Sequence, residues 1–478
     1  MKLRDLYPNI ESDEEITGIA INSKEVKDGN IFVCIKGATT DRHDYIDDAI
    51  NNGAKAIVVT KNVEEKRVPI IKVTDANEEL ALLSQRFFNH PEKKIKLIGV
   101  TGTDGKTSVA TITQTLIGKE DCGYIGTNGY SYKDFKGDTP NTTPSAHLLY
   151  SYFNEFIENG CHYASFEASS EAFFKGRLVH MEFDAAIYTN VTSEHLNTHG
   201  TIENYLDCKL NLFRQTKKDG ICVINKDDKY FEKVKEASNG KVVTYGLDKD
   251  NTLAIEKYEL FTDHTEIHFN YKGESLFINS PLLGEFNVYN LAAALLTCLE
   301  LGFDMNHIMK NLPSTKVDGR LAMIDTNSNY YVMVDYAHTP NGIYQMLKFV
   351  KMLKMNNIIV VIGQAGDRDR FKRPEVGKVV LENASYAIFT YEDPRSEDPR
   401  DICEDIVREA KLTHSNYEFV IDRKEAIEKA VKMAGENDIV LILGKGNETY
   451  QKLKDKVIYF NDIEEAKEAI EKRNKGML

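Results

Sequence analysis

Residues 95–117, IKLIGVTGTDGKTSVATITQTLI, determine the fold predicted for the central part of the chain. The stretch opens with an apolar run typical of a buried parallel strand, continues through a glycine-rich turn at residues 102–105, and ends in a Thr/Ser-rich helix start. Glycines in such a turn let the backbone wrap around a phosphate, and the helix N-terminus adds aligned N–H groups and the positive end of its dipole. The stretch therefore predicts a phosphate-binding loop.

Two residues at the end of the loop suggest its chemistry. The ammonium of Lys106 would reach the β- and γ-phosphates of a nucleotide, and the hydroxyl of Thr107 would coordinate Mg²⁺. The usual spacing G-x-x-x-x-G-K-[ST] is not met, because position 100 is Val. We predict that ATP is bound here by Gly102, Thr103, Asp104, Gly105, Lys106, Thr107 and Ser108.

The length and the net charge of the chain exclude some classes of protein. The 478 residues correspond to about three domains. Acidic residues outnumber basic ones, 74 to 60, and the net charge of -14 argues against nucleic acid or an anionic membrane as the main partner. No apolar run is long enough to span a bilayer and charges interrupt the N-terminus, so we expect no signal peptide and no membrane insertion. Seven cysteines without a C-x-x-C pair indicate reduced thiols, and we expect a cytoplasmic protein.

Strand-like and helix-like segments alternate through three blocks of the chain. This alternation predicts an α/β fold with largely parallel sheets. The pattern changes near Pro91 and near Gly319, where no Pro/Ser-rich linker marks a boundary. We therefore predict three domains, at residues 1–91, 92–318 and 319–478.

The loop variant G-x-x-G-x-[ND]-G-K-[TS] resembles that of the Mur ligase family and of the related folylpolyglutamate synthases. Further motifs resemble those of the Mur ligases in the same order: NSK at 22–24, NTTP at 141–144, FEASS at 166–170, SEHLNTHG at 193–200, YLDCK at 205–209, LGEFNVYN at 283–290, DYAHTP at 335–340, GDRDR at 366–370 and GKGNE at 444–448. The resemblance covers nearly the whole chain. It implies an N-terminal α/β uridine-binding domain, a central P-loop-type parallel-sheet ATPase domain and a C-terminal Rossmann-like domain.

The resemblance also implies an ATP-dependent amide ligase of peptidoglycan precursor synthesis. In such a ligase, ATP phosphorylates the D-Glu side chain of UDP-N-acetylmuramoyl-L-alanyl-D-glutamate, and the amine of a diamino acid attacks the acyl phosphate. Mg²⁺ and Lys106 would offset the repulsion between two polyanions brought together. The expected partners are the UDP-N-acetylmuramoyl-dipeptide, ATP and a free diamino acid, with no nucleic acid, and the chain is expected to be a monomer.

Four catalytic residues are implied by the resemblance: Lys106, Glu167, His195 and Lys209. The implied metal ligands are Thr107, Glu167, His195 and Lys209, the last as a carbamate formed with CO₂. Glu167 ends an apolar strand, from which a carboxylate can hold Mg²⁺. Tyr205, Lys209 and Phe213 are four residues apart and so share one helical face. Lys209 would then either extend its ammonium to solvent past the aromatic rings or, if buried, react with CO₂ as a neutral amine.

Three further sets of residues resemble the substrate contacts of the family. The nucleotide set adds Asn287, Asn290, Arg320, Asp335 and His338. The set for the UDP-muramoyl-peptide is Ser23, His43, Asn141, Thr142, Thr143, Ser169 and Arg177. The set for the incoming amino acid is Arg370, Arg373, Glu392, Asp393, Arg395, Gly444 and Glu448, with the α-carboxylate mainly on Arg370.

The motif EDPR at 392–395 leaves the identity of the added amino acid open. Arg395 suits the second carboxylate of meso-diaminopimelate. Two carboxylates some 4 Å apart, however, repel by about 4 kcal/mol at an effective dielectric of 20, so Asp393 would disfavour that group. Glu392, Asp393 and Glu448 together would suit the bare ammonium of L-lysine or ornithine, with Arg395 then paired to Asp393. On this charge balance we favour a basic diamino acid, with meso-diaminopimelate as a near-equal alternative.

Several positions depart from the usual family pattern: Lys24 for Arg, Asp104 for Asn, Glu171 for His, Asn197 for Asp, Asn341 for Asp and Asn447 for His. They leave open a divergent paralogue that joins an amino acid to a different carboxylate. A non-catalytic nucleotide-binding protein and a folylpolyglutamate synthase are further alternatives. The four implied catalytic residues argue against the former, and the N-terminal block argues against the latter.

Overall fold

The predicted strand and helix of the phosphate loop are present as β5 (Lys96–Thr101) and α4 (Lys106–Ile117). The computed structural model of the chain describes residues 1–37, 40–64, 66–192, 194, 196–261 and 263–478. Leu97 on β5 packs in the core on one face of the central sheet, and Ile98 and Val100 pack in the core on the other. A strand buried on both faces reads as a continuous apolar run, as this one does.

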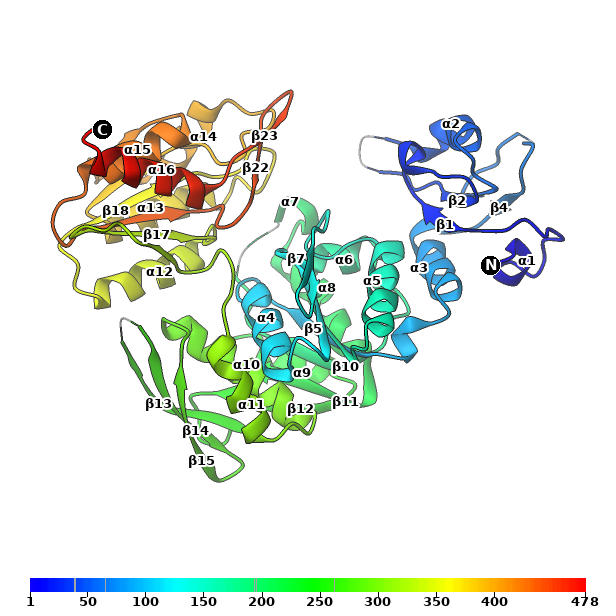
Figure 1. Cartoon of the computed structure of the whole chain (residues 1–478), viewed down its shortest axis with the longest axis horizontal. Helices are drawn as coiled ribbons and strands as arrows, with labels where there is room; N and C mark the ends of the chain where they lie inside the picture. Colours follow the sequence, from blue (N-terminus) through cyan, green and yellow to red (C-terminus); the bar gives the residue numbers. More distant parts are fainter. Residues whose placement is uncertain (38–39, 65, 193, 195, 262) are drawn as a thin grey trace.

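The central domain is built on one large sheet with helices on both faces (Figure 1). The strand order is β15-β14-β13-β12-β11-β10-β5-β9-β6-β7-β8. The middle of the sheet is parallel as predicted, whereas β13 to β15 and β6 to β8 pair antiparallel at its two edges. The further strands are β6 (Cys122–Gly126), β7 (Gly129–Tyr132), β8 (Phe135–Gly137), β9 (Tyr163–Glu167), β10 (Phe183–Tyr188), β11 (Thr216–Asn225), β12 (Lys241–Gly246), β13 (Leu253–Leu260), β14 (Thr265–Tyr271) and β15 (Glu274–Ser280).

Two hydrophobic cores hold helices to this sheet. α4 packs with α10 on one face, and α5 and α8 contribute to the core on the other. The helices are α5 (Ala146–Glu158), α6 (Ser170–Phe174), α7 (Leu196–His199), α8 (Ile202–Arg214), α9 (Phe231–Ala237), α10 (Glu285–Glu300) and α11 (Met305–Asn311). Within the described residues, no helix is both long enough and apolar enough to cross a membrane.

The N-terminal domain is a small parallel sheet in the order β1-β2-β3-β4. Its elements are α1 (Leu3–Leu6), β1 (Gly18–Ala20), β2 (Asn30–Val33), α2 (Ile46–Asn51), β3 (Ala56–Val59), β4 (Ile70–Lys72) and α3 (Ala76–Phe87). Helix α3 contacts α5 of the central domain, and the core on that side runs on from one domain into the other (Figure 1). Packing through α3 therefore fixes how the N-terminal domain is attached.

The C-terminal domain has the strand order β16-β17-β21-β18-β19-β20, parallel except for β16. Its strands are β16 (Ala322–Ile324), β17 (Tyr331–Asp335), β18 (Ile358–Ile362), β19 (Tyr386–Phe389), β20 (Tyr417–Phe419) and β21 (Ile439–Leu443), followed by the hairpin β22 (Tyr450–Lys452) and β23 (Val457–Tyr459). Its helices are α12 (Pro340–Met352), α13 (Arg373–Asn383), α14 (Pro399–Val407), α15 (Arg423–Met433) and α16 (Asp462–Asn474). The predicted three-domain α/β fold is confirmed, and the predicted domain boundaries stay predictions.

Candidate active site

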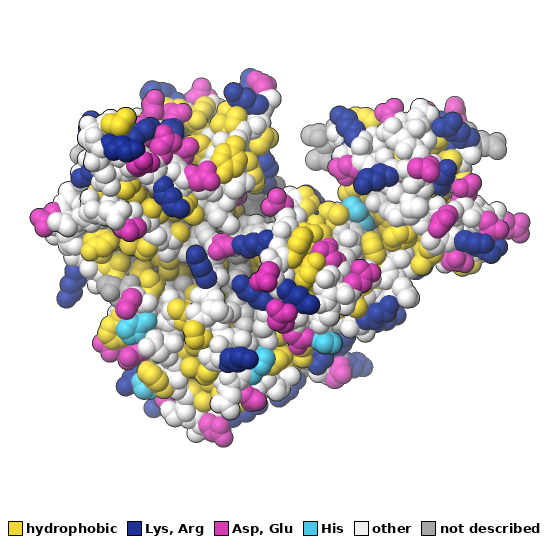
Figure 2. Space-filling model, in the orientation of Figure 1, with side chains coloured by type: hydrophobic (Ala, Val, Ile, Leu, Met, Phe, Trp, Pro, Cys, Tyr) yellow, Lys and Arg dark blue, Asp and Glu magenta, His cyan; other side chains and the backbone are white. Residues whose placement is uncertain are grey.

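A cleft of about 1120 Å³ lies between the central and C-terminal domains. Figure 2 shows the C-terminal lobe on the left above the central domain, with a separate notch between it and the N-terminal lobe on the right. Loops that follow β5, β9, β10, β17 and β18 supply much of the lining, as expected where parallel strands present their carboxyl ends. The predicted residues that line it are Thr103 to Ser108, Asn141, Thr142, Thr143, Glu167, Ser169, Arg177, Lys209, Asn290, Arg320, Asp335, His338, Glu392, Asp393, Arg395 and Glu448.

The phosphate loop brings two lysines to its own carbonyl groups. Lys106 Nζ donates to the carbonyl oxygens of Gly102 (3.0 Å) and Thr103 (2.8 Å), and Lys209 Nζ donates to that of Gly102 (2.6 Å). Gly102 and Gly105 have φ values of +154° and +87°, and a Cβ on Gly102 would lie 1.9 Å from Thr189 Oγ1. Glycine is therefore required at residue 102 by both conformation and space.

Lys209 is buried on α8, with 1% of its surface exposed. Tyr205 and Phe213 are buried on the same helix, which confirms the predicted shared face, and Lys209 Nζ lies 4.3 Å from the centre of the Tyr205 ring. The alternative in which this lysine extends to solvent is wrong, because its ammonium lies inside the protein. Burial, and secondly the charge of Lys106, hold the pKa of Lys209 well below its usual value. The neutral amine is thereby favoured.

Glu167 lies at the end of β9, with 1% of its surface exposed. Its Oε1 accepts hydrogen bonds from the Tyr124 hydroxyl (3.0 Å) and the Thr127 N–H (2.8 Å). Within the described part of the chain it has no basic partner, so a buried negative charge faces the cleft. Such a carboxylate, whose Oε2 accepts from the Thr127 hydroxyl (3.4 Å), fits a hard cation such as Mg²⁺.

Three of the residues predicted to bind the muramoyl-peptide, Thr143, Ser169 and Arg177, lie next to Glu167. Thr143 Oγ1 donates to the Glu167 carbonyl (2.6 Å) and accepts from the Ser169 N–H (3.1 Å). Arg177 Nη1 donates to the Thr143 carbonyl (2.6 Å). Hydrogen bonds thus join three segments that are distant in the sequence into one wall of the cleft.

Two of the predicted nucleotide contacts, Asn290 and Arg320, line the cleft. Asn287 lies behind Asn290, and its side-chain oxygen accepts a hydrogen bond from the Asn290 amide (2.9 Å). Arg320 lies 4.7 Å from the centre of the Tyr336 ring. Asp335 accepts from the N–H groups of Leu321 (2.8 Å) and Ala337 (2.7 Å), and burial raises its pKa. Its carboxylate therefore shapes the loop after β17.

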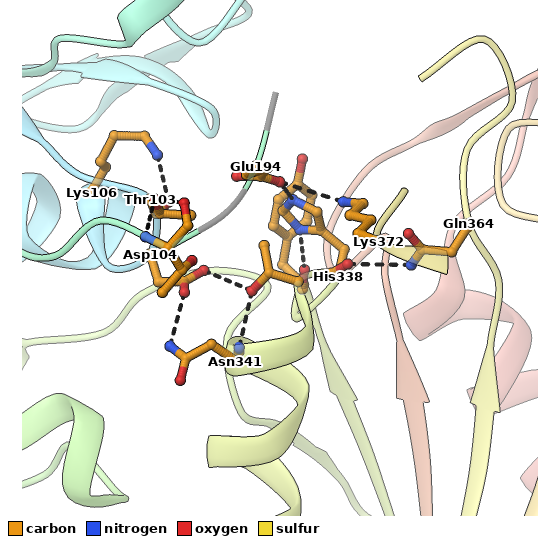
Figure 3. Close-up of polar contacts among 12 residues, drawn as sticks. Thr103, Asp104, Lys106, Glu194, His338, Asn341, Gln364 and Lys372 are labelled. Carbon is orange, nitrogen blue, oxygen red and sulfur yellow. Dashed lines mark hydrogen bonds and ion pairs between the residues drawn. The ribbon is translucent and has the colours of Figure 1, made fainter. Parts of the chain in front are cut away.

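Contacts between the two domains cross the cleft beside the phosphate loop (Figure 3). Glu194 Oε1 of the central domain lies 3.1 Å from His338 Nε2 and 3.4 Å from Lys372 Nζ, both of the C-terminal domain. His338 Nδ1 lies 3.0 Å from the Tyr336 carbonyl. The predicted ligand His195 is outside the described residues, and its role stays a prediction.

The far end of the cleft is built by the EDPR segment and the loop after β21. Lys445 is fully buried, and its Nζ donates to Asp393 Oδ1 (3.1 Å) and Glu448 Oε2 (2.8 Å). The expected pairing of Arg395 with Asp393 is wrong, because Lys445 occupies that carboxylate. Arg395 forms no ion pair among the described residues, and its Nε is buried without a hydrogen-bond partner. Its backbone φ of +54° is rare for a residue with a side chain.

Seven of the described residues that were predicted to bind substrate do not line this cleft: Ser23, His43, Gly102, Asn287, Arg370, Arg373 and Gly444. Arg373 is fully buried, and its two terminal nitrogens bond Glu397, Asp405 and the Ala365 carbonyl. Arg370 pairs with Glu397 (2.8 Å) on another surface. The two ring nitrogens of His43 face Asp41 (2.6 Å) and the Thr60 N–H (3.1 Å) within the N-terminal domain. Gly444, the remaining predicted contact of the amino acid, packs beside Glu392.

Arg368, Lys372, Glu194 and Lys452 line the cleft although none was predicted to bind substrate. Arg368 stands two residues before Arg370 in the run GDRDR, so the sequence located the motif but not which of its arginines lines the cleft. Glu194 stands beside His195 in a quoted motif. Lys452 lies on β22, a hairpin strand for which the sequence carried no motif.

Three family models match the chain in order along its length: the Mur ligase family, catalytic domain (residues 15–88), the Mur ligase middle domain (residues 100–298) and the Mur ligase, glutamate ligase domain (residues 319–446). Two similar relatives are the UDP-N-acetylmuramoyl-L-alanyl-D-glutamate–2,6-diaminopimelate ligases of Clostridium perfringens and Oceanobacillus iheyensis. They are 36% and 38% identical, over 96% of this chain and 96% and 95% of their own lengths.

Solved structures agree with these matches. A structure of a UDP-N-acetylmuramoyl-L-alanyl-D-glutamate–2,6-diaminopimelate ligase superposes with a TM-score of 0.67 and 28% identity, over 99% of both chains. The MurF ligase of Thermotoga maritima in complex with ADP shares the fold, with a TM-score of 0.69 and 19% identity over 96% of this chain and 98% of that one. The matches to the relatives cover 96% of the chain and therefore span all three domains. The chain therefore belongs to the Mur ligase family of ATP-dependent ligases.

Proposed function

We propose that this ligase joins diaminopimelate to the D-glutamate carboxylate of UDP-N-acetylmuramoyl-L-alanyl-D-glutamate, with ATP as the energy source. The relatives that match along the whole chain carry the name of this reaction. The match of residues 15–88 favours this substrate over a folate, because the N-terminal block separates the two kinds of ligase. ATP and a UDP-linked precursor are cytoplasmic metabolites, so we place the reaction there.

The choice of diaminopimelate depends on one observation, the position of Lys445. Its ammonium neutralises Asp393 and Glu448, two of the three carboxylates that on charge alone favoured the bare ammonium of lysine. Arg395, in turn, lines the cleft and forms no ion pair among the described residues, although its charge acts on Asp367. A planar guanidinium matches a carboxylate through two parallel hydrogen bonds. The charge balance thus favours an amino acid with a second carboxylate.

The proposed chemistry divides between the two domains. The phosphate loop and Lys106 would hold the triphosphate, and the residues around Thr143 would present the D-glutamate carboxylate to it. Transfer of the γ-phosphoryl group to that carboxylate makes an acyl phosphate and ADP, and attack of the diaminopimelate amine releases phosphate. A cationic lysine beside the transferred group would stabilise the charge that develops there.

Mg²⁺, when bound, would act as a Lewis acid that offsets the negative charge of the phosphates. We assign Glu167, Thr107 and a Lys209 carbamate to it as ligands, together with His195, which is outside the described residues. The lowered pKa of Lys209 supports the carbamate, because only a neutral amine adds CO₂. The carbamate would turn a buried cation into an anionic oxygen ligand.

Replacing Arg395 by alanine is expected to lower kcat/KM for meso-diaminopimelate by about 100-fold, the value of a charge-assisted hydrogen bond to a carboxylate. The value for L-lysine should change little. Parallel turnover assays and mass spectrometry of the product check this. Arg400→Ala, an exposed arginine on α14 outside the cleft, is the matched control. Preference of the unaltered enzyme for L-lysine would refute the choice of diaminopimelate.

Arg368 rather than Arg370 is expected to bind the α-carboxylate of the incoming amino acid. Arg368 lines the cleft, whereas Arg370 pairs with Glu397 outside it. Arg368→Ala should raise the KM for the amino acid by about 100-fold, and Arg370→Ala by less than about threefold. The reverse ranking in steady-state assays would restore Arg370 to that role.

A further inference from the structure

Asp104, in the phosphate loop, is bound by the C-terminal domain. Its Oδ1 accepts a hydrogen bond from Thr339 Oγ1 (2.9 Å), and its Oδ2 accepts one from Asn341 Nδ2 (3.1 Å) (Figure 3). These partners lie 235 and 237 residues further along the chain. The contact therefore ties the loop that would hold the triphosphate to the domain that would hold the amino acid.

The backbone of Asp104 is fixed on the central domain. Its N–H donates to Asn190 Oδ1 (3.0 Å), and its carbonyl accepts from Thr189 Oγ1 (2.6 Å) and Asn190 Nδ2 (3.2 Å). With the backbone held at both ends, the side chain has a defined direction. It points to the C-terminal domain, not to Lys106 (Figure 3).

The receiving side is the N-terminus of α12, a 13-residue helix. Thr339 caps this helix, so its hydroxyl donates to Asp104 and accepts from the Gly342 N–H (2.9 Å). A carboxylate at a helix N-terminus is stabilised by the positive end of the helix dipole. Asp104 forms no ion pair among the described residues; its side chain accepts from two neutral donors at the helix end, and its charge also acts on Lys209.

The contact joins one carboxylate, on Asp104, to one amide, on Asn341. A pair of one amide and one carboxylate keeps its N–H···O bond when the two groups are exchanged. Two carboxylates cannot form that bond and repel each other.

We propose that Asp104 and Asn341 form a positioning pair, which sets the closed arrangement of the central and C-terminal domains and so aligns the phosphate loop with the amino-acid site. The pair acts through that arrangement and not by contact with the reacting atoms. Its effect on turnover rests on the function proposed above, whereas its effect on domain closure does not.

The test is an exchange of the two side chains. Asn341→Asp alone should lower kcat by about 30-fold, and Asp104→Asn alone by about threefold, within the usual range of coupling between contacting residues. The double variant D104N/N341D should recover to within about threefold of the unaltered enzyme. Asn383→Asp is the matched control, because it adds the same charge to the same domain, beside Lys351 and outside the cleft.

Small-angle scattering supplies a readout independent of turnover. On addition of a non-hydrolysable ATP analogue, the radius of gyration of the unaltered enzyme and of the double variant should decrease. The radius of gyration of Asn341→Asp should not decrease, and its thermal midpoint should be unchanged. The proposal is overturned if Asn341→Asp keeps full turnover and compaction, or if the folded double variant is as impaired as Asn341→Asp. Absence of product from the unaltered enzyme would instead overturn the proposed function, and scattering would still test the pair.

Discussion

Replacing Lys106 by alanine is expected to lower ATP-dependent phosphate release by about 10³-fold, the effect of removing one preorganised charge from a transition state. In the structure, Lys106 Nζ already lies at the phosphate loop, where it donates to the carbonyls of Gly102 and Thr103. Its charge is therefore held at the place where the terminal phosphates would arrive. A phosphate-release assay with the muramoyl-dipeptide and diaminopimelate measures the loss.

Lys119→Ala is the control for this variant, because Lys119 is exposed in the loop after α4 and lies outside the cleft. It should keep near-normal turnover. Circular dichroism and the thermal midpoint establish that both variants are folded. Phosphate release retained by folded Lys106→Ala would refute the role of this lysine.

Replacing Lys209 by methionine is expected to lower turnover by about 10²- to 10³-fold. Methionine has a similar length and is apolar, so it fills the space on α8 without leaving a buried charge. The loss should come from the missing carbamate and not from unfolding, and the thermal midpoint should stay the same or rise. Lys218→Met, at an exposed lysine on β11, is the matched control.

The carbamate itself has a test that does not depend on turnover. Carbon NMR of the enzyme in isotopically labelled CO₂ should show a carbamate signal that Lys209→Met lacks. Activity should fall in CO₂-depleted buffer and return with bicarbonate. If the unaltered enzyme lacks the signal and is indifferent to bicarbonate, Lys209 acts as an amine.

The local structure around the phosphate site could be predicted from sequence because it depends on neighbours along the chain. The apolar run at β5, the glycines at 102 and 105 and the start of α4 each follow from periodicity or from backbone freedom. The same holds for Tyr205, Lys209 and Phe213, whose spacing placed them on one face of α8. The antiparallel edges of the central sheet were not predicted, since strand direction at an edge depends on which strands pair.

The amino-acid end of the cleft shows where such reasoning fails. In the run GDRDR, the spacing does not say which arginine faces the cleft, because these residues lie in a loop without a regular side-chain period. The burial of Arg373 against Glu397 and Asp405 depends on segments more than 20 residues away. The charge balance predicted for the EDPR segment likewise left out Lys445, because this lysine is 52 residues from its partner Asp393 in the sequence.

The sequence by itself determined the order of strands and helices, the phosphate loop with Lys106 and Thr107, and the family to which the chain belongs. Only the tertiary structure decided which charges are neutralised inside the cleft, which arginines face it, and that Asp104 meets Asn341 across two domains. The physical reason is the distance along the chain over which each kind of interaction acts. Backbone conformation and hydrophobic periodicity act over a few residues, whereas hydrogen bonds and ion pairs between loops exist only after packing has brought distant segments together.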